Sequence, residues 1–135
     1  MSILAGINSR LINAEDIAAI VSDRVYPFTT PDPKTHGENT YPLIIYSLVS
    51  TTTPTTFSGE YIHESRVQVD TYAETLKAAI GLSEAIFSRL HGYVGAMGDE
   101  FVGYCLRQNQ RIEHDATNTL YRVSEDYKIG HRDAT

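Results

Sequence analysis

The sequence has little of several things that usually show how a protein is held together or what it binds. A single cysteine, Cys105, excludes an internal disulfide and a cysteine-based zinc site. The 11 basic residues are outnumbered by 17 acidic ones, and the formal charge of −6 argues against binding to nucleic acid by phosphate neutralisation. Apolar runs such as Leu43–Tyr46 are far shorter than the roughly 20 residues that span a bilayer. The first residues also lack the pattern of a signal peptide, so we expect a soluble protein made and used inside a cell.

Motifs for known catalytic chemistry are also missing. No G-x-S-x-G, P-loop, G-x-G-x-x-G or H-E-x-x-H pattern occurs, and the five histidines lack the i, i+4 or H-x-H spacing that brings metal ligands together. The run Glu113–Asp115 is typical of a solvated turn, and Cys105, with no basic or helix N-terminal context, predicts a buried, inert thiol. We therefore expect a protein that is not an enzyme and has no catalytic residues, cofactor or metal site.

What the sequence does have is the composition of an ordinary globular domain. Its 135 residues are 41% hydrophobic and 21% charged, close to the averages for folded domains. Single cores typically take roughly 100–200 residues, and neither a repeat nor a linker divides this chain. We expect a single domain over residues 1–135.

The order of segments predicts an α+β fold. Helical spacing of apolar residues over 2–21, interrupted by a new N-cap at Asn13, predicts two short helices. A longer helix is predicted over 74–90, with a capping box at Thr71–Glu74 and a terminator at Gly92. Extended and alternating patterns predict a short segment at 24–27, strands at 41–53, 61–72, 101–111 and 120–129, and a glycine-rich turn at 95–99. We expect a mixed, mainly antiparallel sheet of about four to five strands, with the long helix packed on one face and the N-terminal helices before it.

Three segments have the features of contact surfaces. A loop over 28–40 is long for a compact domain, and a threonine-rich tip over 50–59 carries an aromatic residue near its apex. The polar faces of two strands mix charges as cross-strand ion pairs do. The alternatives are an ordinary hairpin turn with its aromatic residue folded back, and polar faces that only meet water. The candidate interaction residues are Phe28, Pro31, Pro33, Pro54, Phe57, Glu64, Arg66 and Asp70.

Read along its whole length, the chain resembles the tail completion or tail terminator proteins of long-tailed bacteriophages. The resemblance rests on a helical stretch that ends in D-R-V-Y-P, a proline-containing loop, a Y-P-hydrophobic run, and a V-D-x-Y strand that leads into a helix. A closing strand completes the order. These features lie at residues 17–27, 41–46, 67–73 and 120–127. The loop before Tyr41 is longer here than is usual in that family.

The resemblance implies a structural virion protein of the tail neck, assembled in the host cytoplasm. It would form a ring, expected to be a hexamer, on the end of a finished tail tube, stop tube polymerisation and present the docking surface for the head-side connector. Its partners would be further copies of itself, the tail-tube protein and the head-side neck protein, with no membrane contact. Genomic DNA would pass through the lumen without specific binding, and the net acidity predicts lumen-facing acids that repel phosphate.

Two other interpretations stay open. One is another head-closure or neck connector protein, since such proteins share this size and acidity. The other is a small α+β ligand-binding module or enzyme, whose site would use His63, Glu64 or the run Glu113–Asp115.

Overall fold

The fold is a six-stranded sheet with three helices. The computed structural model describes residues 2–28, 40–53, 62–117 and 119–133. Along the chain the elements are α1 (Ser2–Ile12), α2 (Glu15–Val21), β1 (Val25–Pro27), β2 (Leu43–Thr52), β3 (His63–Ala73), α4 (Leu76–Leu90), β4 (Gly95–Met97), β5 (Glu100–Asp115) and β6 (Leu120–Asp133).

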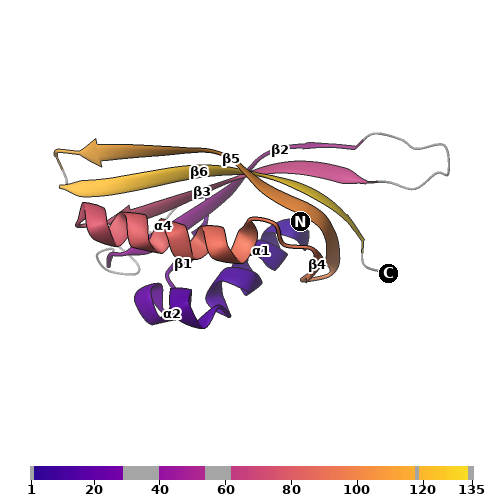
Figure 1. The fold of residues 1–135 in the computed structure, drawn as a ribbon, viewed down its shortest axis with the longest axis horizontal. Helices are drawn as coiled ribbons and strands as arrows, with labels where there is room; N and C mark the ends of the chain where they lie inside the picture. The colour runs from indigo at the N-terminus through magenta and orange to yellow at the C-terminus, as the bar shows by residue number, and fades with distance from the viewer. Residues whose placement is uncertain (1, 29–39, 54–61, 118, 134–135) are drawn as a thin grey trace.

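The strands lie in the order β1-β2-β3-β6-β5-β4. β1 pairs parallel with β2, and every other neighbouring pair is antiparallel. The sheet is long and curls at one end, where β4 and the adjoining ends of β5 and β6 bend toward the helices (Figure 1). No helix among the described residues is both long and apolar enough to cross a membrane.

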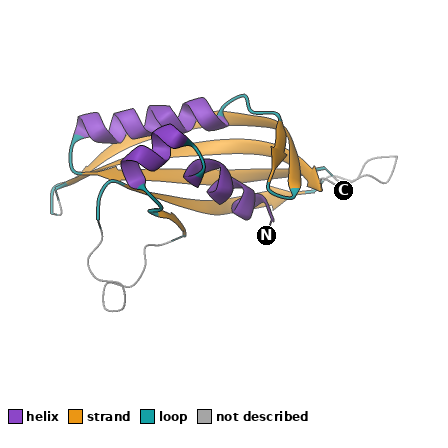
Figure 2. Ribbon diagram, turned by 90° about the horizontal axis from the view of Figure 1, so that it is seen from below, coloured by secondary structure: helices purple, strands orange, loops and turns teal. Residues whose placement is uncertain are grey.

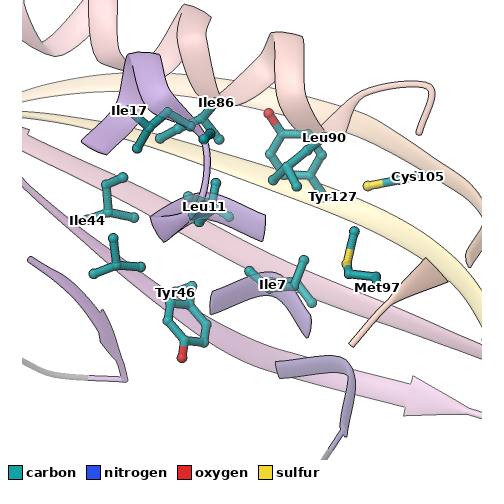
Figure 3. Packing of buried hydrophobic residues seen from close by; sticks show 14 of the residues in the cluster. Ile7, Leu11, Ile17, Ile44, Tyr46, Ile86, Leu90, Met97, Cys105 and Tyr127 are labelled. Carbon is teal, nitrogen blue, oxygen red and sulfur yellow. The ribbon is translucent and has the colours of Figure 1, made fainter. Parts of the chain in front are cut away.

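All three helices cover the same face of the sheet (Figure 2). Their apolar residues recur at the helical period, so that each helix turns one stripe toward the strands. Between the helices and the sheet lies one large core, seen from close by in Figure 3. Its fully buried members include Ile3, Ile7 and Leu11 of α1, Ile17 and Val21 of α2, Leu82, Ile86 and Leu90 of α4, and Ile44, Val67, Val69, Tyr127 and Ile129 of the strands.

The α+β class, the mainly antiparallel mixed sheet and the long helix are as predicted, but the strand count is not. Six strands replace the predicted four to five, because the glycine-rich turn at 95–99 contains β4 and the segment at 24–27 joins the sheet as β1. The long helix also shares its face of the sheet with α1 and α2. The sheet therefore has one covered face and one face with no described element over it.

The predicted starts of α2 and α4 are wrong by a residue or more. The N-cap of α4 is Thr75, whose side chain accepts a hydrogen bond from the Ala78 N–H at 3.1 Å, so the predicted capping box at Thr71–Glu74 does not form. Asn13 does not cap α2 either, since its amide donates to the Ser9 hydroxyl instead. The predicted terminator is confirmed: Gly92 follows α4 with a φ of 80°, a conformation that glycine adopts easily.

Candidate interaction surface and buried polar clusters

The uncovered face of the sheet, here called the outer face, carries the three strand residues predicted as contacts. Strand alternation places Glu64, Arg66 and Asp70 on this face of β3, opposite the helices. The structure thus brings these three together, with β6 beside them. Their hydrogen-bond and ion-pair partners come from the neighbouring strands β6 and β5.

At the curled end of the outer face, Glu64 lies in a cluster that spans three strands. Its carboxylate accepts a hydrogen bond from the Tyr104 hydroxyl of β5 and lies 3.5 Å from Lys128 Nζ of β6. The Tyr104 ring lies over Gly130, where a Cβ atom would have no room. The Tyr104 hydrogen bond, with smaller help from Lys128, lowers the pKa of Glu64. Burial and the bond to Glu64 raise the pKa of Tyr104 to about 12.

Farther along the same face, Asp70 forms a second cluster. Its carboxylate accepts from Arg122 Nη2 at 3.1 Å and from the Gln68 amide, and the same arginine reaches Glu113 at 3.3 Å. Arg66 lies between the two clusters, exposed and without an ion pair among the described residues. The predicted cross-strand ion pairs are therefore present for Glu64 and Asp70.

The outer face as a whole is balanced in charge. Strand register places equal numbers of each sign on it, namely the acids Glu64, Asp70, Glu113, Asp115 and Asp126 and the bases Arg66, Arg111, Arg122, Lys128 and Arg132. The surplus of acidic residues behind the formal charge of −6 lies in the rest of the sequence.

Of the other predicted contact residues the structure describes Phe28, which lies away from this surface. Phe28 follows β1 at the opposite edge of the sheet from β4 and is 59% exposed, with a φ of 65°. Pro31, Pro33, Pro54 and Phe57 lie outside the described residues. The proposed roles of the loop over 28–40 and of the tip over 50–59 stay predictions.

The residues named for the enzyme alternative do not lie together in the fold. His63 and Glu64 are at one end of β3 and alternate between its faces, whereas the run Glu113–Asp115 lies beside the other end of the sheet, near Tyr72. No group of three histidine, cysteine, aspartate or glutamate side chains in the described part of the chain could hold a metal ion. Cys105 is buried as predicted, and burial raises the pKa of its thiol to about 12.

A different set of residues has the connectivity of a hydrolase triad. The Ser65 hydroxyl lies 2.7 Å from His131 Nε2, and His131 Nδ1 lies 2.8 Å from Glu100 Oε1. This is the order of hydroxyl, imidazole and carboxylate that activates a serine nucleophile. Here, however, Ser65 is 0% exposed and Glu100 and His131 are each 2% exposed, all on the helix-covered face. With Thr51, 2.9 Å from Ser65, the cluster links β2, β3, β6 and β5 and holds the curled end together.

A second buried cluster, under α4, centres on Glu125, which is fully buried. Its carboxylate accepts from Ser83 at 2.7 Å, from Arg107 Nη1 at 2.9 Å and from the Tyr127 hydroxyl at 3.2 Å. Burial, reinforced by this carboxylate, raises the pKa of Tyr127. Sequence reasoning missed both buried clusters, because nothing in the sequence next to Ser65, Glu125 and His131 indicates their partners. Those partners come from other elements that the sheet and the helix packing bring together.

The comparisons with known proteins identify no family. No protein-family model matches the sequence, and no curated protein matches it. The fold, however, is similar to that of a chain in a solved virion. That structure is described as the virion of a native gene transfer agent (GTA) particle. The two chains share 15% sequence identity and superpose with a TM-score of 0.69, over 94% of this chain and 92% of the other. The likeness therefore covers nearly the whole of both folds.

The Tyr104 hydrogen bond gives the first test of the outer face. Replacing Tyr104 with phenylalanine is expected to raise the pKa of Glu64 toward its ordinary value, because the bond that lowers it most is lost. In the wild-type protein this hydrogen bond stabilises the folded state at pH values above the unfolded-state pKa of Glu64. The stabilisation is lost as the pH falls through the lower folded-state pKa. Titration of the Glu64 carboxyl by NMR measures the shift. Tyr72→Phe, on the same face, is the control and should leave the pKa of Glu64 unchanged.

The buried position of Ser65 gives the second test. A fluorophosphonate probe, which labels activated serine nucleophiles, is expected to leave Ser65 unmodified in the folded protein, since a fully buried hydroxyl cannot be reached. Intact-mass spectrometry after incubation reads the result, with a known serine hydrolase as the positive control. Labelling of the wild-type protein that disappears in Ser65→Ala would instead identify a working triad.

Proposed function

We propose that this chain is a structural protein of a phage or phage-like virion that caps the completed tail tube. In this proposal residues 1–135 are a single tail-terminator-like domain, and copies of it assemble as a hexameric ring in the neck region. The ring stops tube polymerisation and provides the surface on which the head-side connector docks. Assembly takes place in the host cytoplasm.

The observation that carries the proposal is the fold likeness to a chain of the GTA virion, which extends over 94% of this chain. The segment order that resembles tail terminator proteins supports the more specific neck role. The described residues also favour a non-enzymatic role, because the one triad-like cluster is closed off on the covered face. The predicted contact residues then become candidates for contact with neighbouring copies, the tube or the connector.

The distribution of charge refines the proposed path of the DNA. A channel wall that repels phosphate needs a surplus of acidic groups, and the balanced outer face does not have one. We therefore propose that the outer face, with Glu64, Arg66 and Asp70, contacts protein, and that the lumen is lined by the more acidic rest of the chain. A ring structure with the outer face toward the DNA would contradict this assignment.

The deciding experiment is an assembly assay. Purified protein is added to polymerising tail-tube subunits, and tube length is measured by electron microscopy, with an unrelated acidic protein of similar size as the control. Tubes that stop growing and carry a ring at one end are expected. Unchanged tube lengths, together with rings that bind only the head-side connector, would assign the chain to head closure instead. If the protein neither binds tubes nor restores head joining to defective tails, the neck proposal is wrong.

A further inference from the structure

The far half of β5 has a row of backbone groups with no partner in this chain. Nearer the curled end, the free edge of β5 is occupied: β4 pairs with its first residues, the Gly92 N–H donates to the Cys105 carbonyl at 2.7 Å, and the Arg107 N–H donates to His91 Nδ1 at 3.0 Å. A bulge between Arg107 and Asn109 then shifts the alternation by one residue.

Beyond that bulge, the N–H and C=O groups of Gln110, Ile112 and His114 point away from β6, because Arg111 and Glu113 face their partners there. No described residue occupies this side of them. Such a row is a template on which another extended strand can pair.

The side chains of the same stretch face solvent, although the Gln110 amide donates to the Ser83 hydroxyl at 3.1 Å and Glu113 also pairs with Arg122 at 3.3 Å. Residues 108–114 are all exposed, and the apolar side chain of Ile112 is 50% exposed on the helix-bearing side of the strand. Arg111 has no acidic partner among the described residues, and its one contact is the Ser124 hydroxyl at 3.5 Å. The stretch contains no lysine or proline, the residues that commonly protect sheet edges from pairing.

The sequence of this stretch is complementary to itself in an antiparallel arrangement. If two copies pair about a two-fold axis through Ile112, each Arg111 lies opposite Glu113 of the other copy, and the two Ile112 side chains lie opposite each other. The outward-facing backbone groups of Gln110, Ile112 and His114 then meet in hydrogen-bonded pairs, as the antiparallel ladder requires. Opposite charges and apolar pairs directly across two strands both stabilise the pairing.

We propose that the free edge of β5, from Gln110 to His114, binds the same edge of a second copy of this chain, joining the two sheets into one. Another open stretch, on β2 beyond β1, is a poorer template because a bulge between Leu48 and Ser50 interrupts its row. The pairing does not depend on the proposed neck function, and it concerns the protein free in solution.

Charge exchange tests this register directly. In Arg111→Glu, like charges face each other across the two-fold axis, and Glu113→Arg does the same with the opposite sign. Each variant alone is expected to weaken self-association by about tenfold or more, because like charges opposite each other are destabilising. A mixture of the two variants restores opposite charges at both pairs, so a heterodimer is expected. Lys77→Glu and Glu74→Arg, exposed and outside the strands, carry the same charge changes and should dimerise like wild type.

Sedimentation velocity over a concentration series measures the association, and denaturation curves confirm that each variant folds. In the wild-type protein, amide hydrogen exchange should slow with rising concentration at Gln110, Ile112 and His114 but not at Arg111 and Glu113, which already face β6. A wild-type protein that stays monomeric at every concentration would overturn the proposal. Self-association that the charge exchanges leave unchanged would also overturn the proposal. If the protein still forms rings in that experiment, the result contradicts only the edge pairing and leaves the proposed neck function standing.

Discussion

Replacing Arg107 with methionine is expected to lower the free energy of unfolding by about 3 kcal/mol, because it leaves the carboxylate of Glu125 buried without its cation. Glu125 is fully buried, and among the described residues its one contact with a positive charge is with Arg107 Nη1, at 2.9 Å. Methionine keeps an unbranched apolar stem of similar length, but it also removes the guanidinium group, which lies 4.2 Å from the centroid of the Phe87 ring. The loss should therefore report the charge, its hydrogen bond and this cation–π contact together.

The same strand offers a matched control for this prediction. Arg111→Met makes the identical substitution on β5, at an exposed side chain whose one hydrogen bond among the described residues is to Ser124, at 3.5 Å, and should change stability by no more than about 0.5 kcal/mol. Adding Glu125→Gln to Arg107→Met removes the unpaired charge and should recover part of the loss. Urea denaturation curves compare all four proteins. Equal midpoints for Arg107→Met and Arg111→Met would show that Glu125 does not depend on its arginine.

The Glu125 cluster also shows where sequence reasoning stops. The alternation of β6 correctly assigns Val123, Tyr127 and Ile129 to the covered face, and the same period places Glu125 there with them. A lone glutamate in that series has no visible partner in the sequence, because Ser83 and Arg107 come from other elements. Local periodicity thus predicts which face a residue occupies, whereas pairing between distant segments determines what it contacts.

The strand ends illustrate the same limit. β5 was predicted to end at Arg111 but extends to Asp115. The residues beyond Arg111 show no apolar alternation in the sequence, and they belong to the strand because they pair with β6. The helices were easier to predict, because the 3.6-residue period of Leu82, Ile86 and Leu90 is local. Glu64 and Asp70 were likewise predicted to share a face from local periodicity, because both lie at the polar positions of one alternating strand. Their partners Lys128 and Arg122 needed the register of β3 against β6.

The second large effect on stability is expected at a glycine inside a helix. Replacing such a glycine with alanine usually stabilises a protein, but here we expect the opposite. Gly6→Ala should destabilise the protein by about 2 kcal/mol, although alanine is the better helix former by about 1 kcal/mol. A Cβ atom on Gly6 would lie 2.5 Å from the carbonyl oxygen of Met97 and 2.8 Å from its carbonyl carbon. Because these are backbone atoms of β4, the contact cannot be relieved by turning a side chain, and α1 must move away from the sheet.

Gly81 in α4 supplies the opposite case within the same molecule. It is exposed, and a Cβ atom there would meet nothing within 4 Å, so Gly81→Ala should gain about 0.5–1 kcal/mol from helix propensity alone. Thermal unfolding of the two variants should therefore shift the midpoint in opposite directions from wild type. A rise for both would mean that α1 packs less closely on β4 than the structure shows. A fall confined to Gly6→Ala would establish that the curled end of the sheet is fixed in place by the close approach of α1 to the Met97 backbone.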